Sequence, residues 1–227
     1  ITSLGSPQSV IEACAHIKTK VFCDVTEDEY ARKVEALGAD AVIAVNSEAG
    51  GHAGKLASKD LIPLLRSAVN IPVISAGGVG TGAGFKDKMA LGACGISIGS
   101  PFIATTEAGV SQEYKQAIVD YGSKDIVMTT KLSGTPCTVI KTPYVEEIGT
   151  EQNWLESLLN KNRTLKKYMK MITFYKGMKS LEKAASGATY KTVWCAGPSI
   201  EHVHAIKPVK DNTRQRKAFN QTLSPSR

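Results

Sequence analysis

Short apolar runs alternate with amphipathic segments through the first hundred residues of the chain. The runs KVFCDV, DAVIAV, IPVISA and GISIG predict strands at 20–25, 40–45, 71–76 and 95–99. Valine and isoleucine fill these runs with little polar alternation, which is typical of parallel strands that are covered on both faces. The pattern therefore predicts an α/β fold with a parallel sheet and crossover helices.

The segments between these runs carry the signals of helix ends. Thr26 and Glu29 have the spacing of a capping box, which predicts the start of a helix, and Gly38 is placed to end it. We also expect Asp60 to cap a later helix whose first turn contains Pro63, because proline is tolerated there.

The composition limits the class of protein. The chain has 227 residues, of which 42% are hydrophobic, and this suits one large domain or a domain with an appendage. No run approaches the roughly 18 to 20 apolar residues of a membrane-spanning helix, and the first residues lack the pattern of a signal peptide. The five cysteines are scattered without a Cys-x-x-Cys pair, which argues against a disulfide framework and a zinc site. We therefore expect a soluble cytoplasmic protein without a metal centre.

The net charge of +7 is compatible with nucleic-acid binding. However, no zinc-finger spacing, ribonucleoprotein motif or helix-turn-helix pattern accompanies the basic residues. We therefore expect neither a nucleic acid nor a membrane as a partner.

Glycines follow the carboxyl ends of the predicted strands. The second strand leads into NSEAGGHAG, the third into GGVGTGAG and the fourth into GSPF. In a (β/α)8 barrel these ends share one rim, where a phosphate commonly binds. Gly77 and Gly78 would let backbone N–H groups approach an anion, and Gly99 with Ser100 would add a second lip and a hydroxyl. The same glycines could instead serve only tight turns, so the pattern leaves both interpretations open.

A dinucleotide-binding fold is disfavoured by the spacing of these glycines. The stretch 78–84 contains Gly-x-Gly-x-Gly, which differs from the fingerprint G-x-G-x-x-G, and no acidic residue ends the next strand. A barrel therefore explains the glycines better than a doubly wound sheet.

Three segments resemble the signature segments of a known family. They are GADAVIAVNSEAGGHAGK, IPVISAGGVGTGAGF and LGACGISIGSPFIATTEA, and they resemble the nitronate monooxygenases, formerly called 2-nitropropane dioxygenases. The FMN-dependent enoyl-acyl carrier protein reductases are similar in the same segments. The resemblance runs from Ser3 to about Val209. It implies an FMN-binding TIM (β/α)8 barrel with an inserted helical domain.

The resemblance also implies a flavin site with one catalytic histidine. His52 occupies the catalytic position, where it would take the Cα proton of a nitroalkane or hold the nitronate near the flavin. The glycines beside it would leave space for a flat ring system. The residues implied for FMN binding are Gly50, Gly51, Ala76, Gly77, Gly78, Ser97, Ile98, Gly99 and Ser100.

Three functions remain open. The resemblance favours FMN-dependent oxidation of alkyl nitronates or nitroalkanes by O2 to carbonyl compounds and nitrite. The first alternative is an enoyl-acyl carrier protein reductase that passes hydride from NADH or NADPH through FMN, with an acyl carrier protein as a possible partner. The second alternative is a non-catalytic remnant that binds a phosphate ligand or a partner. Only four clear strands precede the helical part, so the front half of an eight-stranded barrel would be missing, and Pro198 departs from the family pattern.

The resemblance also suggests how the chain is organised. We expect residues 1–110 to form a partial barrel of strands 4 or 5 to 8, so the sequence is interpreted as an N-terminally truncated fragment. Residues 111–187 predict a helical insert or lid, because strand signals fade there and apolar residues recur at helical spacing. Residues 188–209 would return to the barrel, and 210–227 would form a basic polar tail. Basic residues between 161 and 183 suit a solvated helix face or a docking surface for an acyl carrier protein.

Several polar residues need separate interpretation. We expect Glu48 to fix the turn that follows it rather than to act as a second acid or base. His202 and His204 lie two residues apart, but no further ligand pair completes a metal site. Asn46 stands where the family usually has glycine. Pro198 stands where it has glutamine, which removes an amide side chain and a backbone donor.

Overall fold

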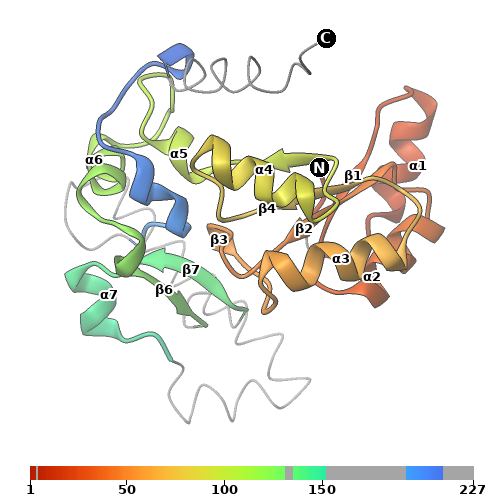
Figure 1. Cartoon of the computed structure of the whole chain (residues 1–227), viewed down its shortest axis with the longest axis horizontal. Helices are drawn as coiled ribbons and strands as arrows, with labels where there is room; N and C mark the ends of the chain where they lie inside the picture. The colour runs from red at the N-terminus through yellow and green to blue at the C-terminus, as the bar shows by residue number, and fades with distance from the viewer. Residues whose placement is uncertain (4, 131–134, 152–192, 212–227) are drawn as a thin grey trace.

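The computed structural model describes residues 1–3, 5–130, 135–151 and 193–211 (Figure 1). The predicted helical positions in 152–187, the basic surface at 161–183 and most of the predicted tail lie outside the described residues. Within the described part of the chain, no helix is long and apolar enough to cross a membrane.

A four-stranded parallel sheet forms the first part of the structure. Its strands are β1 (Phe22–Val25), β2 (Ala41–Val45), β4 (Val73–Ala76) and β5 (Gly95–Ser97), and they lie side by side in the order β1-β2-β4-β5. Thr2 adds a parallel bridge to Cys23 on the outer side of β1. The four predicted strands and the α/β class are therefore confirmed. Their order follows the chain without the reversal of a doubly wound sheet, as expected for consecutive units of a barrel.

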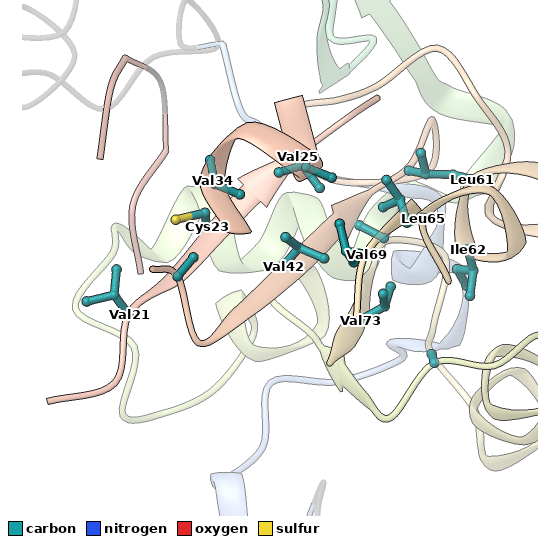
Figure 2. Close-up of a cluster of buried hydrophobic side chains, with 14 of the residues drawn as sticks. Val21, Cys23, Val25, Val34, Val42, Leu61, Ile62, Leu65, Val69 and Val73 are labelled. Carbon is teal, nitrogen blue, oxygen red and sulfur yellow. The ribbon is translucent and has the colours of Figure 1, made fainter. Parts of the chain in front are cut away.

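Helices cover one face of this sheet. Helix α1 (Gln8–His16) precedes β1, while α2 (Asp28–Ala36), α3 (Ser58–Ala68) and α4 (Gly82–Ala90) each connect one parallel strand to the next. Figure 2 shows the buried cluster that joins α1, α2 and α3 to the sheet, in which Leu61 and Leu65 of α3 meet Val42 of β2 and Val73 of β4. All four of these side chains are fully buried. This apolar contact fixes the helices on the sheet.

The opposite face of the sheet is also apolar. Ile43 and Val45 of β2 form a separate buried cluster there, against the partly buried side chains of Phe22, Ile74 and Ala76. Successive side chains of a strand point to opposite faces, so β2 is buried at all five positions. This second face leads to the cavity described below.

The predicted capping box does not form. Helix α2 starts directly after Glu27, and no side chain caps its first turn. The side chain of Thr26 instead lies beside Gly54, where a built Cβ would be 3.2 Å from the Thr26 methyl. Packing against the loop after β2 has therefore replaced the capping bond that the spacing of Thr26 and Glu29 predicted.

The ends of the other helices agree with the sequence only in part. Asp60 is not the cap of α3: it lies in the first turn, where its carboxylate still faces the positive end of the helix dipole, and Pro63 lies further inside. The predicted end at Gly38 is confirmed, because Gly38 has φ 96° and directly follows the C-cap of α2. Gly92, with φ 101°, ends α4 in the same way.

The second part of the structure contains a small antiparallel sheet. Strands β3 (Gly51–His52), β7 (Cys137–Ile140) and β6 (Ile126–Thr129) lie in the order β3-β7-β6, accompanied by α5 (Ser100–Ile103), α6 (Gln112–Asp120), η1 (Ser123–Asp125) and α7 (Pro143–Ile148). Figure 1 shows β6, β7 and α7 grouped at the lower left, away from α1 and α2. The described residues of the predicted helical insert or lid at 111–187 contain helices α6 and α7 and also the strands β6 and β7, which the sequence did not predict.

A return segment, residues 193–209, connects the two parts. The backbone N–H of Ile140 donates to the carbonyl of Trp194, and Cys195 forms an antiparallel bridge with Val139 of β7. The segment then forms η2 (Pro198–His202), and Lys207 makes a parallel bridge with Thr105. The segment thus passes from the antiparallel sheet to the loops that follow the parallel strands.

Candidate functional site

A cavity of about 210 Å³ lies where the parallel strands end. Loops after β2, β4 and β5 line it, together with the end of β1 and Ser199 of η2. The expectation that these loops share one rim is therefore confirmed. The lining includes most of the predicted site residues: Gly50, His52, Ala76, Gly77, Gly78, Ser97, Ile98, Gly99 and Ser100. Gly51 is not among them; it lies in β3 and pairs with Thr138 of β7.

The turn after β4 has room only for glycine. Gly77 and Gly78 have φ values of 109° and 76°, a backbone conformation that other residues rarely adopt. A Cβ on Gly77 would lie 2.5 Å from the backbone nitrogen of Ala49, and one on Gly78 would collide with the carboxylate of Glu48. The turn after β4 is thus pressed against the loop after β2.

Asn46 ties these two loops together. Its side chain is fully buried, its amide nitrogen donates to the Gly77 carbonyl at 3.3 Å, and its amide oxygen accepts from the backbone N–H of Glu48 at 2.8 Å. From the sequence, Asn46 is only a departure from the family's glycine. In the structure it fixes one loop against the other.

Ser100, the first residue of α5, performs a similar function for the return segment. Its hydroxyl accepts a hydrogen bond of 2.9 Å from the backbone N–H of Gly197, so the return segment is held against α5. A Cβ on Gly50 would lie 2.6 Å from this hydroxyl oxygen and 2.8 Å from the Gly197 nitrogen. The hydroxyl keeps its own proton for donation. Pro198 begins η2, where a missing N–H costs no intrahelical bond.

A partly buried ion pair lies behind the turn after β4. The ammonium of Lys88 is 3.2 Å from the Glu48 carboxylate and also donates to the hydroxyl of Ser58. Lys88 comes from α4, and its side chain is only 11% exposed. The pair holds the Glu48 carboxylate beside Gly78. The predicted role of Glu48 in fixing the turn that follows it stays a prediction. Sequence reasoning missed Lys88, because a lysine in an amphipathic helix usually points to solvent.

Asp24 places a carboxyl group on the inner face of the sheet. It lies on β1 and lines the cavity, and burial raises its pKa, while a hydrogen bond to the Ser3 side chain acts in the opposite direction. Sequence reasoning did not single out Asp24. The available signal was one acidic residue within the apolar run KVFCDV.

His52 is held in place from the antiparallel sheet. It lies on β3 directly opposite Cys137 of β7, and its side chain is exposed at the cavity. Thr138, the next residue of β7, donates its hydroxyl to the carbonyl of Ala49 and lies 3.3 Å from that of Gly51. The turn that precedes the imidazole is therefore fixed by a strand that the sequence did not predict.

The structure shows no sign of a metal centre in the part that it describes. Among those residues, no group of three or more histidine, cysteine, aspartate or glutamate side chains could hold a metal ion. His202 and His204 are both exposed, at the end of η2 and just beyond it. The five cysteines are free thiols.

Comparison with known proteins identifies the family. The family model for nitronate monooxygenase matches residues 1–214. The chain belongs to this family. Over 159 residues it is 35% identical to a probable nitronate monooxygenase of Staphylococcus saprophyticus. The match covers 65% of this chain and 45% of that protein. The recognition of the nitronate monooxygenase family from the three sequence segments is therefore confirmed.

Two further relatives widen the comparison. A Rhodococcus jostii protein named (3aS,4S,5R,7aS)-5-hydroxy-7a-methyl-1-oxo-octahydro-1H-indene-4-carboxyl-CoA dehydrogenase is 30% identical over 199 residues, which are 86% of this chain and 56% of that protein. The solved structure of FabK from Thermotoga maritima matches with a TM-score of 0.78 and 32% identity, over 97% of this chain and 67% of that one. The chain spans about half the length of the curated relatives it matches.

Proposed function

We propose that this nitronate monooxygenase family member takes part in the FMN-dependent oxidation of alkyl nitronates by O2 to carbonyl compounds and nitrite. The observation that carries the proposal is the single cavity in which His52 meets the glycine turns after β4 and β5. Family membership and the Staphylococcus saprophyticus relative support the same chemistry.

The glycine turns fit a phosphate group. Within the described chain, no hydrogen bond to another protein group is recorded for the backbone N–H groups of Gly77, Gly78 and Gly99. A Cβ on Gly99 would meet nothing within 4 Å, so its backbone borders open space. Phosphate oxygens accept hydrogen bonds from such converging N–H groups. We therefore assign these residues, with Ser100, to the phosphate of FMN.

The charges beside these turns also bear on phosphate binding. The carboxylate of Glu48 would repel a phosphate if it were unpaired. Its ion pair with Lys88 offsets this charge and brings a cation behind Gly78. The cavity of about 210 Å³ is smaller than the roughly 300 to 1,000 Å³ of most small-molecule sites. The described residues would therefore hold the phosphate end and one side of the ring system.

His52 is the residue that we assign to the substrate. When bound, FMN supplies the electron-accepting chemistry that the oxidation requires. A neutral His52 imidazole would take the Cα proton of a nitroalkane, whereas a protonated one would pair with the negative nitronate. Gly50 and His52 both line the cavity, so the imidazole borders the space that the substrate would occupy.

The proposal is tested by His52→Asn in protein supplied with FMN. We expect oxygen uptake to fall by about 10² to 10⁴-fold, the usual contribution of a positioned acid or base. A loss with the nitroalkane but not with its preformed nitronate would assign proton removal to His52. Equal losses would assign nitronate binding. His204→Asn is the matched control, because His204 is exposed and lies outside the cavity, and it should retain full activity.

A second candidate is reduction or dehydrogenation of an acyl thioester. The Rhodococcus jostii relative, named for a carboxyl-CoA substrate, covers more of this chain than the Staphylococcus saprophyticus one does. The reduction would consume NADH or NADPH with an enoyl thioester of coenzyme A or acyl carrier protein, whereas a dehydrogenation would take two electrons from the acyl thioester. NADH oxidation with the thioester, together with an inert nitronate, would exclude the first proposal. Failure of both reactions and of flavin binding would leave a phosphate- or partner-binding remnant.

A further inference from the structure

Two cysteines lie against each other beside the cavity. The sulfur atoms of Cys137 and Cys195 are 3.7 Å apart, although 58 residues separate them in the sequence. Cys137 belongs to β7 and is 4% exposed, whereas Cys195 lies in the return segment and is half-buried. The bridge between Cys195 and Val139 of β7 holds the two segments in register.

We propose that Cys137 and Cys195 form a redox-active pair that hydrogen peroxide converts into a reversible disulfide. A disulfide bond is about 2.05 Å long, so the two sulfur atoms need to approach by less than about 2 Å. This inference rests on the contacts of the two thiols and does not depend on the proposed oxidation of nitronates.

The two thiols are chemically unequal. A hydrogen bond from the Cys137 thiol lowers the pKa of Cys195, and burial opposes this effect. The same contact, and then burial, raise the pKa of Cys137. Because Cys195 is the more exposed of the two, it is the thiol that meets peroxide first, and Cys137 is the thiol that resolves the product.

The reaction balances with one molecule of peroxide. The Cys195 thiolate attacks one peroxide oxygen, the O–O bond breaks, and the departing hydroxide takes a proton to become water. The Cys137 sulfur then attacks the resulting sulfenic acid and forms the S–S bond. The hydroxyl group leaves with the Cys137 proton as a second water. Two thiols lose two electrons, and an added dithiol restores both of them.

Each cysteine lies close to a contact of a cavity-lining residue, His52 for Cys137 and Ser100 for Cys195. Cys137 lies directly opposite His52 in the pairing of β3 with β7. Cys195 lies two residues before Gly197, whose N–H donates to the hydroxyl of Ser100, the first residue of α5. The hydroxyl of Tyr114 donates to the Cys195 carbonyl and holds this backbone in place. The disulfide would therefore tie the strand opposite the imidazole to the segment behind Gly50.

The test oxidises the purified chain with about one equivalent of hydrogen peroxide, followed by alkylation under denaturing conditions and peptide mapping. We expect a linked pair of peptides containing Cys137 and Cys195, and an intact mass lower by about 2 Da, both reversed by dithiothreitol. The control Cys94→Ser removes an exposed thiol outside the pair and should form the disulfide as the wild type does.

Two single substitutions separate the roles of the thiols. Cys137→Ser should leave Cys195 to oxidise beyond the sulfenic acid, and Cys195→Ser should leave Cys137 reduced. A substitution at buried Cys137 can impair folding. The oxidation state of the two thiols in the wild-type protein therefore decides the proposal independently of the variants. The proposal is wrong if both thiols stay reduced when Cys94 oxidises, or if either of them links to another cysteine.

Discussion

The two sheets contribute different kinds of groups to one cavity. The parallel sheet contributes mainly backbone, because its strands all end at the same edge and lead into the turns at Gly77, Gly78 and Gly99. The antiparallel sheet contributes a side chain, the imidazole of His52 on β3, and supports it from Thr138 on β7. Parallel strands gather N–H groups whatever their side chains are, whereas a single strand residue determines which reactive group is present.

The two sheets also differ in how much buried apolar packing holds them in place. A large cluster of valine, leucine and isoleucine side chains holds the parallel sheet against its helices (Figure 2). The buried cluster around β7 is much smaller and consists of Cys137, Val139 and Val145. The position of β3 and β7 therefore depends more on individual hydrogen bonds. Substitutions at the two sheets should have different consequences.

The largest effect is expected where the backbone of the parallel sheet meets the loop after β2. Gly77→Ala forces a side chain into a φ of 109° and places its Cβ 2.5 Å from the Ala49 nitrogen. We expect the free energy of unfolding to fall by about 2 to 4 kcal/mol, from backbone strain and overpacking together. Urea unfolding measures the change. Gly109→Ala is the matched control, because its Cβ meets nothing within 4 Å, and it should cost far less.

A smaller effect is expected from the antiparallel sheet. Thr138→Val removes the hydroxyl that bonds to the carbonyls on both sides of Gly50 and leaves a buried acceptor unpaired. We expect a loss of about 1 to 3 kcal/mol in the free energy of unfolding, with His52 less precisely placed. Thr138→Ser keeps the hydroxyl and should retain more of the stability. If valine and serine prove equal, the hydroxyl does not hold the turn that carries His52.

The sequence predicts the first sheet far better than the second, and the reason is physical. Each parallel strand lies within a short apolar run, and the loops after β2, β4 and β5 contain glycines, so strand type and loop position can be inferred locally. The cavity then follows from the rule that parallel strand ends share an edge. The nine lining residues named from the family resemblance come from these loops and from the strands beside them, and their roles in FMN binding and catalysis stay predictions.

The second sheet leaves little local signal. β3 has two residues, Gly51 and His52, within a stretch that reads as a loop, and β6 and β7 have four residues each. The parallel strands β1 and β4 are equally short, but they belong to a repeated alternation of apolar runs and amphipathic segments, which the sequence around β6 and β7 lacks. The contacts of Gly197 with Ser100, and of Cys195 with Cys137, join residues far apart in the chain. Scattered cysteines therefore gave no sequence signal of the close pair that the fold creates.

Asp24 provides the finest test of the comparison, because it is a charged side chain on the sheet that otherwise contributes backbone. Burial raises its pKa above the ordinary value of 3.8. The folded protein therefore binds a proton more tightly than the unfolded chain, and stability is lost as the pH rises from about 3.8 through the raised pKa. Asp24→Asn removes this loss, so the variant should gain stability relative to wild type between acidic and neutral pH. Solvent screening of a half-buried group limits the gain to below about 1 kcal/mol.

Asp40→Asn supplies a control of opposite sign. Hydrogen bonds from the Lys20 ammonium and from the backbone N–H of Val21 lower the pKa of Asp40, so this carboxylate contributes stability that is present above its ordinary pKa and lost as the pH falls. The Asp40 variant should therefore lose stability relative to wild type over the same pH range in which the Asp24 variant gains it. Thermal unfolding of the three proteins at several pH values measures both differences. A pH-independent difference for Asp24→Asn would mean that the inner face of the parallel sheet solvates this carboxylate as well as water does. The parallel sheet would then contribute the charged side chain of Asp24 to the cavity as well as backbone N–H groups.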